Sequence, residues 1–201
     1  MVKFTRLFFA LLGFSAIITE IIVLLERGIF MPANFFSFFT ILSNIGAVGI
    51  LLFASIASER TWGLRVTQQI RGAATLYMLM TGVIFAVLLS GITDVALTAV
   101  PWDNIVLHYI MPIVLVADWL LYPPKTKLSY KIVAAWAVVP ILYVIYSLIR
   151  GAIVGWYPYP FLNAEIQGYP SVIVTTIFLA VFVILAALAT VWYTRWRLGK
   201  S

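Results

Sequence analysis

Apolar residues in this chain fall into six long runs, separated by short segments that carry glycine, proline and charge. A helix needs roughly 20 mostly apolar residues to cross the hydrocarbon core of a bilayer, and the runs have about this length. The pattern therefore predicts six transmembrane helices, over residues 4–25, 35–57, 72–91, 104–122, 132–149 and 170–193. We expect residues 1–201 to form a single domain, an all-α membrane protein built as a bundle of six transmembrane helices.

Composition supports a membrane protein and argues against a nucleic-acid partner. Hydrophobic residues make up 64% of the chain and charged residues 10%, more apolar surface than a soluble fold of this size can cover. The net charge is +6, but the basic residues lie singly or in small groups at the ends of the apolar runs. Basic residues so placed determine topology rather than bind nucleic acid.

The basic residues also predict the orientation of the bundle. All but Arg27 and Arg150 of the 13 lysines and arginines fall on one side of it. By the positive-inside rule, that side faces the cytoplasm. Both termini are therefore predicted to be cytoplasmic. The first apolar run is long, and no small-residue cleavage motif follows it, so we expect an uncleaved first helix rather than a signal peptide.

An aromatic segment precedes the last predicted helix. Trp156, Tyr157 and Tyr159 alternate there with Pro158 and Pro160. Aromatic residues at a membrane boundary are usually interfacial anchors. Prolines hold the backbone extended, so the segment also has the stiffness expected of a lid folded over the helix ends. Both interpretations stay open.

Three polar residues are predicted to lie at similar depth near the outer surface. Glu20, Thr40 and His108 each lie about five residues from the outer end of their helix, or roughly 8 Å at 1.5 Å per residue. Asn44 follows Thr40 by one helical turn and Asn104 precedes His108 by one turn, so each pair shares a helix face. Burying polar or ionisable side chains in a membrane costs free energy, so residues of this kind are candidates for a functional role.

The chemistry of this layer has two interpretations. In one, His108 acts as general base for the Thr40 hydroxyl. In the other, the polar side chains only form hydrogen bonds between helices. Pro112 cannot donate a hydrogen bond to the carbonyl group of His108, so we expect a kink at His108 and a free acceptor beside it.

The remaining charged residues at membrane depth suggest ion pairs. Asp118 and Arg71 are predicted at similar depth near the cytoplasmic side, where an ion pair would fix the helix register. Glu20 has three candidate partners at the outer side, because it can pair with Arg27 or Arg150 or orient the ring of His108.

We expect no metal site and no cofactor. The chain has no cysteine and a single histidine. Paired carboxylates suited to a dimetal site and a glycine-rich phosphate loop are also missing from the sequence.

Three segments together resemble a known group of membrane proteins. They are residues 38–44 (FFTILSN), residues 102–108 (WDNIVLH) and residues 156–162 (WYPYPFL). In order and spacing they resemble bacterial six-helix membrane proteins related to the eukaryotic androgen-induced and Rolling stone group. Members of the androgen-induced group are intramembrane threonine hydrolases that cleave fatty acid esters of hydroxy fatty acids. The resemblance implies a nucleophile at Thr40, a base at His108 and a location in the bacterial cytoplasmic membrane.

The sequence thus predicts an intramembrane hydrolase whose substrate is a membrane lipid or fatty acyl ester. Supporting or substrate-binding roles are predicted for Asn44, Asn104, Glu20, Trp102, Trp156, Tyr157 and Tyr159. The alternative is a small transporter or lipid-binding protein that uses the same polar layer without covalent catalysis, with His108 or Glu20 carrying protons. A third interpretation is a structural or interaction protein in which these residues only pack helices.

Overall fold

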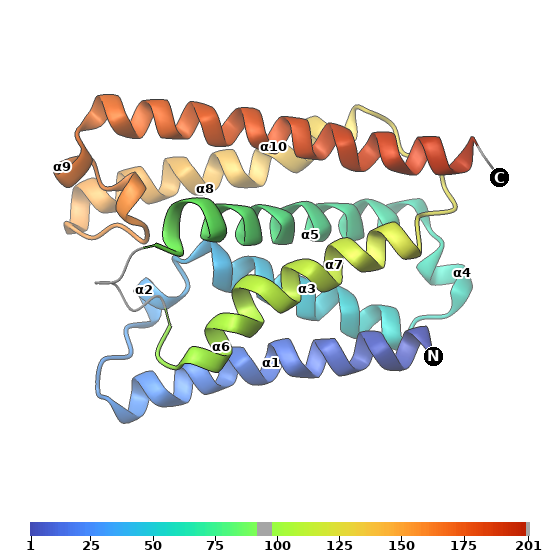
Figure 1. Ribbon diagram of the computed structural model, residues 1–201, viewed down its shortest axis with the longest axis horizontal. Helices are drawn as coiled ribbons and strands as arrows, with labels where there is room; N and C mark the ends of the chain where they lie inside the picture. The colour runs from blue at the N-terminus through green and yellow to red at the C-terminus, as the bar shows by residue number, and fades with distance from the viewer. Residues whose placement is uncertain (92–97, 200–201) are drawn as a thin grey trace. The chain divides into compact units, whose positions relative to one another are not determined.

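The computed structural model describes residues 1–91 and 98–199, and every regular element in these ranges is a helix (Figure 1). The predicted all-α fold is therefore confirmed. Lys200, which we counted on the cytoplasmic side, lies outside the described residues. Six described stretches are long and apolar enough to cross a membrane: Val2–Glu26, Phe39–Ile56, Arg65–Leu89, Pro101–Leu121, Ile132–Val154 and Tyr169–Leu198. The protein is an integral, multi-pass membrane protein.

The first of two compact units, Met1–Thr126, holds four of these stretches. Its helix α1 lies along α3, and α5 packs against both α3 and α7. Figure 1 shows the N-terminus and α4 at one end of this unit and α2 at the other. In chain order its elements are α1 (Val2–Glu26), α2 (Pro32–Phe35), α3 (Phe39–Ile56), α4 (Glu59–Trp62), α5 (Arg65–Ile84), the π-helical turn η1 (Phe85–Leu89), α6 (Pro101–Ile105), the π-helical turn η2 (Val106–Ile110) and α7 (Met111–Leu121).

The second unit begins at Lys127 and contains the last two stretches. Its helices α8 (Ile132–Val154) and α10 (Tyr169–Leu198) run antiparallel and pack along each other (Figure 1). A short 3-10 turn, η3 (Pro160–Leu162), and helix α9 (Ala164–Gln167) connect them. Gly155 ends α8 in the left-handed conformation, with φ of 65°, which glycine adopts without strain.

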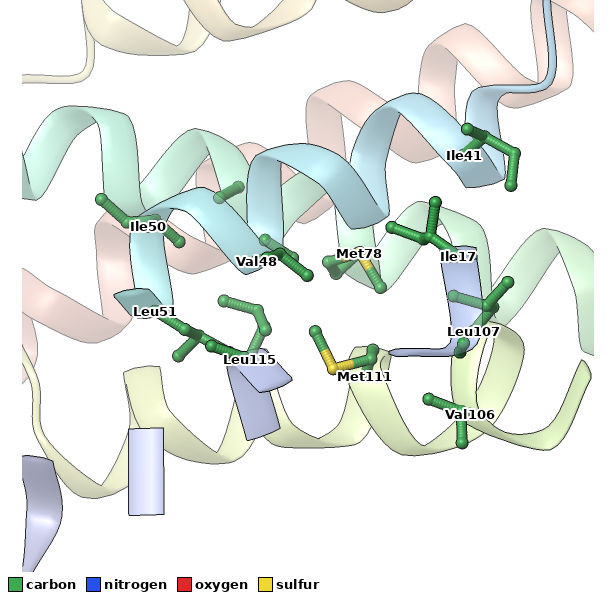
Figure 2. Packing of buried hydrophobic residues seen from close by; sticks show 14 of the residues in the cluster. Ile17, Ile41, Val48, Ile50, Leu51, Met78, Val106, Leu107, Met111 and Leu115 are labelled. Carbon is green, nitrogen blue, oxygen red and sulfur yellow. The ribbon is translucent and has the colours of Figure 1, made fainter. Parts of the chain in front are cut away.

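Buried aliphatic side chains from α1, α3, α5 and the η2–α7 stretch form the core of the first unit (Figure 2). Gly13 brings α1 close to its neighbours, because a Cβ there would lie 2.8 Å from Met111 Cε and 3.0 Å from Val48 Cγ2. Small residues allow this approach between membrane helices, whose association depends on van der Waals packing. The members labelled in Figure 2 are Ile17, Ile41, Val48, Ile50, Leu51, Met78, Val106, Leu107, Met111 and Leu115.

Three predicted helix ends fall five or more residues short because the helices continue beyond the apolar runs. α5 begins at Arg65 rather than at residue 72, α8 continues through Arg150 to Val154, and α10 continues past residue 193 to Leu198. Hydropathy indicates which residues lie in the hydrocarbon core. The backbone hydrogen bonds of a helix form equally well outside that core, so a helix can continue past the last apolar residue. The connection between α8 and α10 is therefore shorter than predicted.

The second predicted helix, residues 35–57, is divided in the structure. A short helix, α2, ends at Phe35, and α3 starts at Phe39. Between them Phe38 is extended, with φ of −79° and ψ of 125°. Because the break lies within an apolar run, hydropathy alone gives no sign of it. Thr40 consequently lies in the first turn of α3, whereas the predicted helix placed it more than one turn from the helix start.

A buried ion-pair cluster joins three helices of the first unit. Arg71 of α5 lies 2.8 Å from the carboxylate of Asp118 on α7, which is the pair predicted from depth. Arg6 of α1 also contacts Asp118, at 2.8 Å, and its guanidinium lies over the ring of Trp62. The place of Arg6 at the start of an apolar run predicts only a topology signal, but its side chain is almost fully buried. Two cations on one carboxylate fix the register of α1, α5 and α7.

Candidate active site

Thr40 is the second residue of α3, and its side chain is buried. The first turn of a helix has backbone N–H groups that find no partner within the helix, and the helix dipole places partial positive charge there. A hydroxyl group at this position therefore lies where negative charge is stabilised. This property follows from the break before Phe39 and would be absent from an uninterrupted helix.

His108 lies in the middle of the π-helical turn η2. The irregularity occurs at the place that Pro112 predicted, four residues upstream of the proline. Proline lacks the N–H group that would bond to the His108 carbonyl. The structure has a π turn at this place, a feature that is rare in helices and frequent at functional sites. The kink itself stays a prediction.

The two side chains meet inside the first unit. Thr40 Oγ1 lies 3.3 Å from His108 Nε2, and both residues are buried. His108 Nδ1 lies 3.2 Å from the backbone oxygen of Asn104. A carbonyl oxygen only accepts, so Nδ1 carries the proton of the neutral ring and Nε2 presents its lone pair to the Thr40 hydroxyl. This is the arrangement that a general base and its nucleophile require.

Asn44 connects the two elements that carry this pair. Its Nδ2 donates to the backbone oxygen of Thr40 at 2.8 Å and to that of Leu107, in η2, at 3.1 Å. Both amide hydrogens are thereby used. Asn44 therefore positions Thr40 and His108 rather than donating to a bound substrate. The Thr40 oxygen also accepts a hydrogen bond from Ser43 Oγ at 3.1 Å.

Aromatic and hydroxyl groups of α5 and η1 complete the surroundings. The Phe85 ring stacks on the His108 ring, with centroids 4.1 Å apart and planes inclined by 24°. Ser43 Oγ lies 2.8 Å from Thr81 Oγ1, so a second polar contact joins α3 to α5. Neither Phe85 nor Thr81 was predicted to belong to the site. A polar residue inside an apolar span is a usable signal for Thr81, whereas a phenylalanine in an apolar helix gives none.

Glu20 makes its described contacts at a different place. Its Oε2 accepts a hydrogen bond from the backbone N–H of Ala99 at 2.7 Å, and its carboxyl group lies beside that of Asp103, which is fully buried. Arg27 approaches the same segment and donates to the oxygen of Ala99 at 2.9 Å. Of the predicted alternatives for Glu20, the described contacts favour the neighbourhood of Arg27 over the orientation of the His108 ring.

The predicted supporting residues are only partly brought together. Asn104 reaches the site through its backbone oxygen, while its buried Oδ1 has no hydrogen-bond partner among the described residues. Trp102 lies on the surface of α6 and is 41% exposed, so its role stays a prediction.

The aromatic segment belongs to the second unit and packs on that unit's own helix. The Tyr157 ring lies against Gly151 of α8, where a Cβ would overlap it, and Trp156 stacks on the Arg150 guanidinium. Tyr159 is buried, with its ring stacked on Phe161 at 5.2 Å. These contacts hold the segment against the end of α8. Its predicted roles, as interfacial anchor, as lid over the helix ends and in substrate binding, stay predictions.

No family model, no curated protein and no solved structure matches this chain. Within residues 1–91 and 98–199, no group of three or more histidine, cysteine, aspartate or glutamate side chains is arranged to hold a metal ion. The candidate site is thus defined by its own geometry, a hydroxyl group and an imidazole ring in contact inside a membrane protein.

Proposed function

We propose that this protein is an intramembrane hydrolase of fatty acyl esters, with Thr40 as nucleophile and His108 as general base. The observation that carries the proposal is the contact of 3.3 Å between Thr40 Oγ1 and His108 Nε2. These residues are far apart in sequence, and a buried contact between them requires α3 and η2 to be held together. Asn44 supports this arrangement through its hydrogen bonds to both elements.

The proposed reaction has two balanced halves. Thr40 Oγ1 attacks the ester carbonyl carbon while its proton passes to His108 Nε2. The tetrahedral intermediate then expels the alcohol, which takes this proton, and leaves an acyl group on Thr40. In the second half, a water molecule gives a proton to Nε2 and attacks the acyl carbon. Thr40 recovers the proton as the fatty acid leaves. The positive end of the α3 dipole stabilises the negative charge that develops in both halves.

The location of the pair supports a lipid as substrate. Thr40 and His108 lie within spans of a membrane protein, among the buried apolar residues of its first unit. A water-soluble ester would have to leave water to reach them, whereas a fatty acyl ester is already dissolved in the bilayer. The likeness of residues 38–44 and 102–108 to the androgen-induced group points to the same substrate class.

Hydrolysis by the purified protein tests the proposal. Wild-type protein in lipid nanodiscs should release fatty acid from long-chain esters, and Thr40→Ala and His108→Ala should each lower kcat by about 10³-fold or more. Thr190→Ala is the matched control, because Thr190 is also a buried threonine on a membrane helix but its hydroxyl bonds to its own backbone. It should retain wild-type turnover. Equal turnover in all four folded proteins would refute the assignment.

A transporter or lipid-binding protein is the second candidate function, and the carboxyl groups of Glu20 and Asp103 favour it. They lie side by side and are buried at the end of the first unit that is predicted to face outward. Ionisable groups at such positions are typical of proton-coupled transporters. Covalent labelling separates the two functions. A fluorophosphonate probe should modify Thr40 in a hydrolase, and it should leave the Thr40→Ala variant and a transporter unlabelled.

A further inference from the structure

We infer that Phe85 is a positioning residue for His108, and that it holds the imidazole ring in the one orientation that presents Nε2 to Thr40. This inference rests on the proposed function for its kinetic consequence. The orientation itself is a property of the fold and is measurable without substrate.

The argument begins with the stacking geometry. The Phe85 and His108 rings have centroids 4.1 Å apart and are inclined by only 24°, and both side chains are buried. Turning the imidazole about its Cβ–Cγ bond sweeps its edges out of the ring plane and into the Phe85 ring. The stacked ring therefore opposes the rotation that would move Nε2 away from Thr40.

The direction in which the ring is held matters because its two nitrogens have different roles. The Asn104 oxygen engages Nδ1 and leaves Nε2 as the acceptor for the Thr40 hydroxyl. A single hydrogen bond at 3.2 Å defines one edge of the ring, whereas the stacking contact defines its plane. Together they fix both the tautomer and the direction of the lone pair. An aromatic face also attracts the positive charge that His108 acquires when it takes the proton.

Two local features bring Phe85 to this position. Phe85 opens the π turn η1 and His108 lies in the π turn η2, so the irregular parts of two spans face each other. Gly82, one turn before Phe85, allows the close approach, since a Cβ there would lie 2.9 Å from Pro112 Cβ and 3.6 Å from the His108 oxygen. Gly82 and the two π turns thus bring the Phe85 ring against the imidazole, and the Phe85 ring orients it.

The chain offers a direct measurement, because His108 is its only histidine. In protein labelled with ¹⁵N-histidine, the imidazole nitrogens give signals from this residue alone, and their chemical shifts report the tautomer. We expect wild-type protein in detergent micelles to show a single species protonated at Nδ1. In Phe85→Leu, the stacking is lost while the site stays apolar, and we expect a mixture of tautomers or averaged signals.

Kinetics give the second measurement, with Leu89→Ala as the matched control. Leu89 is buried in the same π turn as Phe85, and its truncation costs more core packing than Phe85→Leu does. Phe85→Leu should lower kcat by about 10- to 100-fold with KM changed less than about twofold, as expected for a misplaced base. Leu89→Ala should keep the wild-type imidazole signals and kcat, whatever it does to stability.

The outcomes separate this inference from the proposed function. If Phe85→Leu keeps both the single tautomer and the wild-type kcat, the role of Phe85 is refuted while the hydrolase stands. If wild-type protein cleaves no ester but Phe85→Leu alters the imidazole signals, the proposed function falls and the positioning of His108 stands. Equal changes in Phe85→Leu and Leu89→Ala would show a general loss of packing and would overturn the inference.

Discussion

Asn44 shows how a single side chain holds the candidate site together. Its amide nitrogen bonds to one carbonyl group in α3 and to one in η2, the elements that carry Thr40 and His108. Its Oδ1, in contrast, is buried without a hydrogen-bond partner among the described residues. An unsatisfied buried acceptor costs about 1–3 kcal/mol. Asn44 therefore contributes more to the geometry of the site than to the stability of the fold.

Replacement of Asn44 should affect the geometry of the candidate site more than the stability of the fold. We expect Asn44→Leu to change the free energy of unfolding by only about 1 kcal/mol, because hydrogen bonds between membrane helices are worth about 0.6 kcal/mol on average. Its kcat should fall by about tenfold or more, since α3 and η2 are no longer joined. Denaturation in detergent measures the first quantity and ester hydrolysis the second.

Leu51→Ala provides the opposite comparison. Leu51 is a fully buried member of the core of the first unit, and its truncation should cost about 2–5 kcal/mol while the folded fraction keeps its kcat. Wild-type kcat in Asn44→Leu would contradict the positioning role of Asn44.

At the level of single residues, the sequence predicted three polar members of the candidate site and missed Thr81 and Phe85. Thr40, Asn44 and His108 stand out because polar groups are rare in apolar runs. Depth placed Thr40 and His108 in one layer, and helical spacing placed Asn44 on the same face as Thr40. Phe85 belongs to the same site, but a phenylalanine in an apolar helix resembles any core residue. Its role became visible only from its stacking on His108.

At the level of elements, the sequence predicts helix irregularities that the backbone chemistry of a single residue causes. It does not predict those that tertiary packing causes. Pro112 predicted a kink at His108, because a missing N–H group is a property of the residue itself, and the π turn η2 lies at that place. The break between α2 and α3 was missed, because residues 35–39 are as apolar as the helices around them. The presence of the spans was predictable from sequence, whereas their ends and interruptions depend on the neighbouring helices.

Gly82 tests how close α5 must come to α7. A Cβ at this position would lie 2.9 Å from Pro112 Cβ in α7, so Gly82→Ala should push α5 away from α7 and cost about 1–3 kcal/mol. Gly46→Ala is the control, because nothing lies within 4 Å of the corresponding Cβ on α3. It should be neutral, or stabilising by up to about 1 kcal/mol through helix propensity. The free energies of unfolding of both variants check this, and equal values would contradict the packing argument.

At the level of the whole molecule, charge distribution links the fold to its orientation in the membrane. One end of the first unit holds the Arg6–Asp118–Arg71 cluster, and Lys3 Nζ donates to the oxygen of Ala57 there at 2.8 Å. The cytoplasmic location of this end stays a prediction from the positive-inside rule. The division of the helices into two compact units had no signal in the sequence, because it depends on contacts between distant residues.

Cysteine labelling tests the predicted orientation, and the chain contains no native cysteine to interfere. Ile29→Cys and Ser58→Cys place exposed thiols at opposite ends of the first unit. A membrane-impermeant maleimide should label Ile29→Cys in intact cells and Ser58→Cys only after permeabilisation. The reverse pattern would invert the topology and place the Thr40–His108 pair towards the inner leaflet.

The π turn that carries His108 also bears on how such a site arises. A π turn is a helical turn with one residue inserted, and the helix on either side of it continues nearly unchanged. We therefore expect deletion of one residue from Val106–Ile110 to leave α6 and α7 facing the same neighbours. The residues of the turn itself would rotate about the axis and take the imidazole away from Thr40. Insertion or deletion of a single codon in this window would thus form or separate the proposed catalytic pair while the rest of the fold is kept.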